Sequence, residues 1–194
     1  MTEPPTDGPR APHVTAEGAL PGDPTREQLL DEIIRVDQAG EYGAVRIYAG
    51  QLAVLGRSPA AGHIRAMAAK EREHLDAFNR MIVERRVRPT ALTPLWHLAG
   101  FALGAATALL GERAAMACTV AVEEVIGEHY AQQAQALGDD ESKLRTTIEE
   151  FRRDELEHRD TALAHHATEA PAYAVLSAAV KAGSRLAIWL STRI

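Results

Sequence analysis

Two Glu-x-x-His motifs are the sequence feature that most constrains this chain. They occupy residues 71–74 and 155–158, and each follows a further glutamate, Glu41 or Glu123, by a similar interval of 30 or 32 residues. Positions i and i+3 lie on the same face of a helix, so each motif directs a carboxylate and an imidazole toward one point. The candidate ligands are Glu41, Glu71, His74, Glu123, Glu155 and His158.

Apolar residues spaced by three and four place these six side chains on buried stripes of four predicted helices. Met67 and Phe78 flank the first motif on one stripe, and Ile148 precedes Glu155 on another. A buried, unpaired charge there would be unfavourable, and a bound metal ion would neutralise it. The alternative is a set of solvated Glu and His side chains on surface helices, which these stripes disfavour. One Glu from each of two helices and one Glu-x-x-His from each of two others is the ligand set of di-iron and di-manganese bundles.

Length, charge and cysteine content narrow the class of protein further. A chain of 194 residues with only 5% aromatic residues predicts one domain of closely packed helices rather than a sheet. The net charge of −6 and the lack of a basic run argue against nucleic-acid binding. Cys118 is the only cysteine, which excludes an intramolecular disulfide and predicts a packed residue in a reducing compartment.

The first 24 residues differ in composition from the rest of the chain. They contain six of the ten prolines and show no apolar periodicity, so a disordered tail is predicted over 1–24. The tail lacks the apolar core of a secretory signal, and its acids and prolines make it a poor transit peptide. A bacterial cytoplasmic protein is the simplest interpretation.

Start and stop signals predict four long helices after the tail. The first covers 25–56, because Thr25 begins a capping box. The second covers 59–86, the third carries Glu123, and the fourth covers about 142–169 after a polar turn. These elements predict an all-α fold, a ferritin-like four-helix bundle.

An apolar insert at about 87–111 joins the second helix to the third. Its run from 95 to 110 contains one ionisable side chain, His97. A transmembrane helix is rejected, because the insert is short, contains Pro94 and two glycines, and must lead the chain back into the bundle. Two readings remain open: a long helical crossover packed on the bundle, or one that also enters a membrane surface.

The last segment, from Pro171, is predicted to form an extra basic amphipathic helix. Lys181, Arg185 and Arg193 interleave with apolar residues, and Trp189 lies near its end. This helix can pack on the bundle or contact a membrane. Together the two apolar elements favour a peripheral membrane protein. The predicted domain covers 25–194, including the insert.

The ligand types indicate the chemistry. Six ligands for two metals leave coordination positions open, as a catalytic site requires. Ligation rich in oxygen, with two imidazoles and no thiolate, favours iron or manganese over zinc or copper. Two ferrous ions in such a site predict activation of O2. Asp37, one turn before Glu41, is predicted either to accept a hydrogen bond from a ligand imidazole or to form a salt bridge with an arginine.

Several long segments resemble the demethoxyubiquinone hydroxylase family of ubiquinone biosynthesis. The resemblance is carried by RVDQAGEYGAVRIYAGQLAVLG (35–56), VRPTALTPLWHLAGFALGAATALLGERAAMACTVAVEE (87–124), RRDELEH (152–158) and APAYAVLSAAVKAGSRLAIWLS (170–191). The metal ligands of that family map onto the same six residues that the apolar stripes indicate. Gln38 departs from the family, in which relatives often have histidine, but this change removes no ligand.

The resemblance implies a di-iron monooxygenase that hydroxylates the ring of a demethoxyubiquinol with O2. It implies a polyprenyl quinol as substrate, NADH or another reductant as electron source, and a lipid-binding accessory protein as partner. The expected location is the cytoplasmic face of the bacterial cell membrane. Tyr130 and His129 are predicted to touch the quinone head or to relay electrons, although His129 lies off the stripe and packing is its simpler role.

Two other functions are compatible with the same predicted helices. A ferritin-like or rubrerythrin-like iron oxidase or peroxidase would share all six ligands, but it has no reason to expose an apolar crossover. A non-catalytic module that binds a membrane or a partner would not need the ligand glutamates. The sequence leaves the oligomeric state and the length of the polyprenyl tail open.

Overall fold

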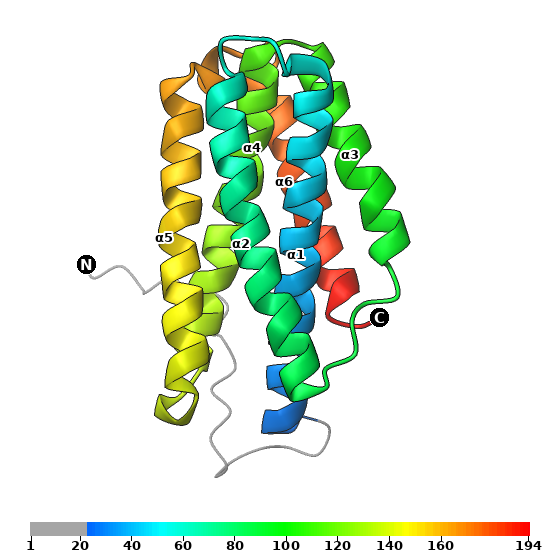
Figure 1. Ribbon diagram of the computed structural model, residues 1–194, viewed down its shortest axis with the longest axis vertical. Helices are drawn as coiled ribbons and strands as arrows, with labels where there is room; N and C mark the ends of the chain where they lie inside the picture. The colour runs from blue at the N-terminus through cyan, green and yellow to red at the C-terminus, as the bar shows by residue number, and fades with distance from the viewer. Residues whose placement is uncertain (1–22) are drawn as a thin grey trace, which may run out of the picture.

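The computed structural model describes residues 23–194, and this part of the chain is all-α, as predicted. The predicted disordered tail lies outside the described residues except for its last two positions. The helices are α1 (Arg26–Leu55), α2 (Ala61–Arg85), α3 (Thr93–Leu109), α4 (Glu112–Ala136), α5 (Ser142–Ala164) and α6 (Tyr173–Ser191), with short 3-10 turns at η1 (Asp139–Glu141) and η2 (Ala167–Glu169). Four of them, α1, α2, α4 and α5, form the predicted ferritin-like bundle (Figure 1).

The helix boundaries follow local capping chemistry. Thr25 caps α1 as predicted, because its hydroxyl accepts a hydrogen bond from the Gln28 amide and the Gln28 side chain accepts one from Thr25. The second helix was predicted from Pro59, but Pro59 lies in the turn before α2. The predicted end of the fourth helix near residue 169 is also wrong, because the chain leaves α5 at Ala164 and His166 adopts a left-handed conformation with φ 60°.

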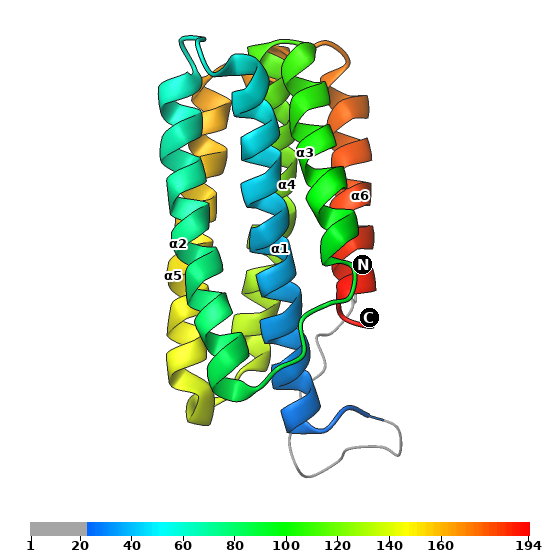
Figure 2. The same ribbon diagram turned by 45° about the vertical axis from the view of Figure 1, so that its right-hand side comes forward.

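The apolar insert forms α3, which packs along α1 outside the bundle (Figure 2). Glycines allow the two helices to approach closely. A Cβ at Gly104 would overlap the carbonyl oxygen of Ile47, and a Cβ at Gly50 would overlap that of Phe101. Larger side chains at these two positions would separate the helices. Within residues 23–194, no helix combines the length and apolar character needed to cross a membrane.

Two apolar clusters fill the bundle above and below the candidate ligands. One contains Ile34, Phe78 and Ile148, and the other contains Ile64 and Met116. Along each of the four bundle helices, the candidate ligands lie between residues of the first cluster and residues of the second. Buried Cys118 packs in the first cluster, as predicted. The bundle therefore encloses one polar layer between two apolar ones.

Candidate metal centre

The structure brings the six predicted side chains together in this polar layer. None of the six exposes more than 6% of its surface. Two sets of four residues emerge, each with ligand atoms within 4.8 Å of one another. The first set is Glu41, Glu71, His74 and Glu155, and the second is Glu71, Glu123, Glu155 and His158.

Glu71 and Glu155, the first residues of the two motifs, belong to both sets. Their carboxylates can therefore bridge two cations. Each cation position also has one glutamate and one histidine that the other position does not share. We call them the His74 position, which has Glu41, and the His158 position, which has Glu123.

The polar atoms of this cluster fit two divalent cations. Both oxygens of Glu71 and of Glu155 are buried without a hydrogen-bond partner, and so are the Nδ1 atoms of His74 and His158. His158 Nδ1 lies 2.8 Å from a Glu71 oxygen, and His74 Nδ1 lies 3.2 Å from a Glu155 oxygen. Buried polar atoms are almost always satisfied in proteins, so this concentration of unsatisfied ones fits a set of residues that binds positive ions.

The crowding of these buried carboxyl groups changes their pKa values. Burial raises the pKa of Glu71 and Glu123 well above the ordinary value, and the nearby Glu155 raises both further. Burial also raises the pKa of Glu155, although its contact with His74 opposes the change. Without a cation the cluster is therefore costly to ionise, whereas bound cations would favour the ionised ligands.

Two tyrosines hold the outer glutamates in a reciprocal arrangement. Tyr48 donates a hydrogen bond of 2.6 Å to Glu123, and Tyr130 donates one to Glu41. Sequence reasoning singled out Tyr130 but gave Tyr48 no functional role. The signal was present, because Tyr48 follows Glu41 by the same two helical turns that separate Tyr130 from Glu123.

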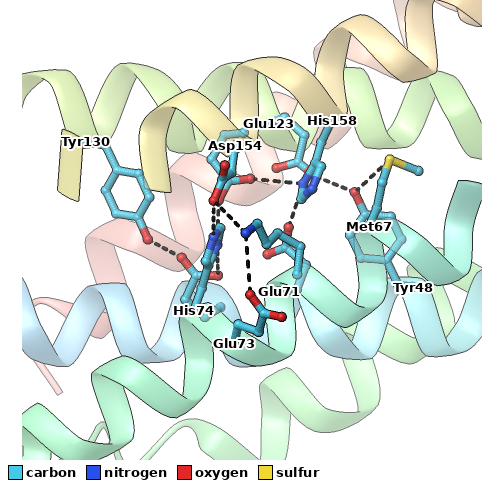
Figure 3. A network of polar contacts seen from close by, with 12 residues as sticks. Tyr48, Met67, Glu71, Glu73, His74, Glu123, Tyr130, Asp154 and His158 are labelled. Atoms are coloured by element: carbon cyan, nitrogen blue, oxygen red, sulfur yellow. Dashed lines mark hydrogen bonds and ion pairs between the residues drawn. The ribbon is translucent and has the colours of Figure 1, made fainter. Parts of the chain in front are cut away.

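The partner of the His74 imidazole is Asp154 rather than Asp37. Asp154 Oδ2 lies 3.0 Å from His74 Nε2 (Figure 3). Asp37 is buried and accepts a hydrogen bond of 2.7 Å from Gln133, and among residues 23–194 it contacts neither a ligand imidazole nor an arginine. Both predictions for Asp37 are therefore wrong. Asp154 was missed although it directly precedes Glu155.

His129 lies outside the six-residue cluster. Its Nε2 accepts a hydrogen bond of 2.9 Å from Gln133 and lies 3.7 Å from an oxygen of Asp37. Burial lowers the pKa of His129 to about 4, so the ring is neutral near pH 7. This position is consistent with packing, and a contact of His129 or Tyr130 with a quinone stays a prediction.

An apolar cavity of about 360 Å³ lies between α1, α3, α4 and α6, and none of the six candidate ligands lines it. Gly40 and Gly43 line it next to Glu41, and Val122 lines it next to Glu123. Trp96 of α3 and Ser191 of α6 also line it, and the indole donates a hydrogen bond of 3.1 Å to the serine. The cavity thus reaches the turns of α1 and α4 that carry two candidate ligands.

A four-helix bundle with a buried cluster of carboxylates and histidines defines a ferritin-like protein. The family model described as "Ubiquinone biosynthesis protein COQ7" matches residues 28–191, and the chain belongs to this family.

Individual relatives agree with that assignment. The chain is 61% identical over 181 residues to "3-demethoxyubiquinol 3-hydroxylase" of Rhodospirillum rubrum, covering 93% of this chain and 85% of the relative. It is 55% identical over 169 residues to the human "NADPH-dependent 3-demethoxyubiquinone 3-hydroxylase, mitochondrial", covering 85% and 78%. It is 45% identical over 186 residues to the yeast "5-demethoxyubiquinone hydroxylase, mitochondrial", covering 86% and 78%.

The raised carboxyl pKa values predict how the metal-free protein responds to pH. A carboxyl group whose pKa is higher in the folded chain keeps its proton where the unfolded chain has lost it, so stability falls as the pH rises above about 4.3. We expect chelator-treated protein to melt at a lower temperature at pH 7.5 than at pH 5.5, followed by circular dichroism. The melting temperature of the metal-loaded protein should not fall in this way between pH 5.5 and pH 7.5.

The Glu123→Gln variant is the matched control, because its side chain cannot ionise. Its metal-free form should lose less stability between the two pH values than the metal-free wild type. An equal or larger loss in the variant would contradict the assigned cause.

Proposed function

We propose that residues 25–194 form one ferritin-like enzyme domain that hydroxylates the ring of a demethoxyubiquinol with O2 at a pair of iron ions. The observation that carries the proposal is the convergence of six buried ligand side chains in a bundle whose helices α1 and α4 also line an apolar cavity. The names of the relatives support the reaction, since they describe hydroxylases of demethoxyubiquinol or demethoxyubiquinone.

The six ligands would form two iron positions that share two of the glutamates. Glu41 and His74 would hold one iron ion, Glu123 and His158 the other, and the two shared glutamates would bridge them. Bound ferrous ions supply the electrons and open coordination positions that O2 activation requires. The hydrogen bonds from Tyr48 and Tyr130 orient the outer glutamates, and the apolar clusters on both sides keep bulk water from the site.

The cavity suits the substrate proposed. Its lining is almost entirely apolar, which matches a polyprenyl chain and the faces of a quinol ring. A ring placed beside Gly43 and Val122 would lie next to the turns that carry Glu41 and Glu123. We propose NADH or NADPH as the source of electrons, with Tyr130 and His129 near the quinone head.

A polyprenyl substrate resides in a bilayer, and α3 and α6 carry apolar side chains that the fold leaves exposed. Leu98 and Leu109 of α3 expose 70% and 75% of their surfaces, and Leu186 and Trp189 of α6 expose 56% and 51%. Both helices line the cavity. We therefore propose peripheral binding at the cytoplasmic face of a bacterial membrane, with these helices toward the lipid and accessible to a lipid-binding accessory protein.

Membrane binding can be tested on this surface. The double variant Leu98→Gln/Leu186→Gln should bind anionic phospholipid vesicles at least about tenfold more weakly in a flotation assay, because each leucine contributes about 1.5–3 kcal/mol on burial in an apolar phase. The control is Val83→Gln, which changes an equally exposed apolar side chain on α2. Equal vesicle binding by all three proteins would confine α3 and α6 to internal packing.

The reaction itself is tested with labelled oxygen. The reduced, iron-loaded protein, supplied with demethoxyubiquinol, a reductant and ¹⁸O₂, should form a ring-hydroxylated quinol with one ¹⁸O atom, measured by mass spectrometry. An iron oxidase or peroxidase would consume the oxidant without labelling the quinol. Product labelled from water, or no product from fully iron-loaded protein, would overturn the hydroxylase proposal.

A further inference from the structure

The two halves of the bundle repeat the same polar pattern. Helices α1 and α2 carry a glutamate, a tyrosine two turns later and a Glu-x-x-His motif, and α4 and α5 carry the same series. The equivalent pairs are Glu41 and Glu123, Tyr48 and Tyr130, Glu71 and Glu155, and His74 and His158. Each tyrosine bonds the glutamate of the opposite half, so the contacts repeat as well as the residues.

The repeat breaks beside the two bridging glutamates. The first motif reads KEREH from Lys70, and the second reads DELEH from Asp154. In the structure Asp154 accepts the hydrogen bond of His74 across the α2–α5 interface. The residue equivalent to Asp154 is Lys70, a cation, which cannot accept a hydrogen bond from His158.

Lys70 instead supports the contact made by Asp154. Its ammonium nitrogen lies 3.6 Å from Asp154 Oδ2, the same oxygen that contacts His74, and 3.4 Å from Glu73 (Figure 3). Across residues 23–194, no side chain forms a hydrogen bond with the outer Nε2 of His158. Within this part of the chain, the His74 imidazole therefore has a hydrogen bond at its outer nitrogen, and the His158 imidazole has none there.

Packing adds to this difference. The His74 ring stacks on Phe151, with centroids 3.9 Å apart and planes 21° apart, and the side chain is 1% exposed. Among residues 23–194, the one aromatic contact of the His158 ring is an edge-on contact with Tyr48 at a centroid distance of 6.4 Å, and the His158 side chain is 8% exposed. The orientation of the His74 ring is consequently more restricted before a cation binds, so binding at its Nδ1 costs less conformational entropy.

We propose that Asp154 is a positioning residue that makes the His74 position the tighter of the two, so that the site fills in a fixed order. A carboxylate on the outer nitrogen fixes the tautomer and orientation of a ligand imidazole and increases its basicity. Lys70 keeps the Asp154 carboxylate aimed at His74. This inference rests on the metal site of the proposed function, and it does not depend on the hydroxylation reaction.

A titration of metal-free protein with Co²⁺, followed by visible absorption, tests this order. Wild type should bind two ions in two separable steps. In Asp154→Ala the tighter step should weaken by about 10–100-fold, while the weaker step stays unchanged. Asp154→Glu, which keeps the carboxylate, should recover part of the loss. Glu149→Gln removes an exposed charge from α5 outside this network, and should match wild type.

Single-ligand variants assign the steps to positions. His158→Ala should retain the tight step, and His74→Ala should lose it. Wild-type steps of equal affinity would overturn the proposal, as would equal weakening of both steps in Asp154→Ala while the variant keeps its helical circular dichroism. Because Co²⁺ binding is read without turnover, an ordered titration from a protein that fails the ¹⁸O test would reject the hydroxylase and retain the ordered site.

Discussion

Replacing Glu71 with alanine is expected to empty both metal positions and abolish hydroxylation. Glu71 belongs to both sets of four ligand residues, so its loss removes a ligand from each. The decrease in turnover should exceed the factor of about 100 that marks the upper range for substituting an outer partner of a ligand. Elemental analysis for iron per chain, measured beside turnover on the same sample, checks the expectation.

The matched control is Glu150→Ala, which removes an exposed glutamate from α5. This variant should retain the metal content and turnover of wild type. Glu71→Ala should also retain its helical circular dichroism, because four long helices with two apolar clusters remain around the site. Full iron content and full turnover in Glu71→Ala would reject the ligand assignment.

The bundle and the six candidate ligands could be predicted because they depend on local periodicity. A helix repeats every 3.6 residues, so positions i and i+3 share a face whatever the neighbouring helices do. Apolar stripes through Met67 and Ile148 then indicate which face is buried. The similar intervals from Glu41 to Glu71 and from Glu123 to Glu155 place the four carboxylates at similar depths in antiparallel helices.

The outer partners of the ligands could not be predicted in this way. Whether His74 meets Asp37 or Asp154 depends on the axial register and rotation of facing helices, which the period of one helix does not determine. The interval between Glu41 and Tyr48 hinted at a repeated role, but only the assembled bundle shows that each tyrosine crosses to the opposite half.

The cavity is likewise a product of the assembled helices. Its walls come from α1, α3, α4 and α6, which are distant in sequence. Two of its lining residues, Gly40 and Gly43, lie inside α1, where glycine is less favourable than alanine by about 1 kcal/mol. A Cβ at either position would meet no atom within 4 Å, so close packing does not explain these glycines. Because they have no side chain, they leave this space open as part of the cavity.

Replacing Gly43 with leucine should therefore slow hydroxylation strongly while leaving the metal site and the fold intact. The new side chain would occupy the cavity next to the helical turn that carries Glu41, where the substrate ring is proposed to lie. Its Cβ meets no steric conflict, and helix propensity favours leucine over glycine, so the melting temperature should not fall. We expect wild-type iron content and at least about a tenfold loss of kcat/KM, since a misplaced substrate of even 1 Å can cost about 100-fold.

Gly62→Leu separates this effect from helix propensity. Gly62 is also a helical glycine whose Cβ would meet nothing within 4 Å, but it lies in α2, outside the cavity. The control should retain turnover, whereas Gly40→Leu should repeat the loss seen at Gly43. Unchanged hydroxylation of a long-chain quinol by both cavity variants would show that the substrate reaches the metal centre by another route.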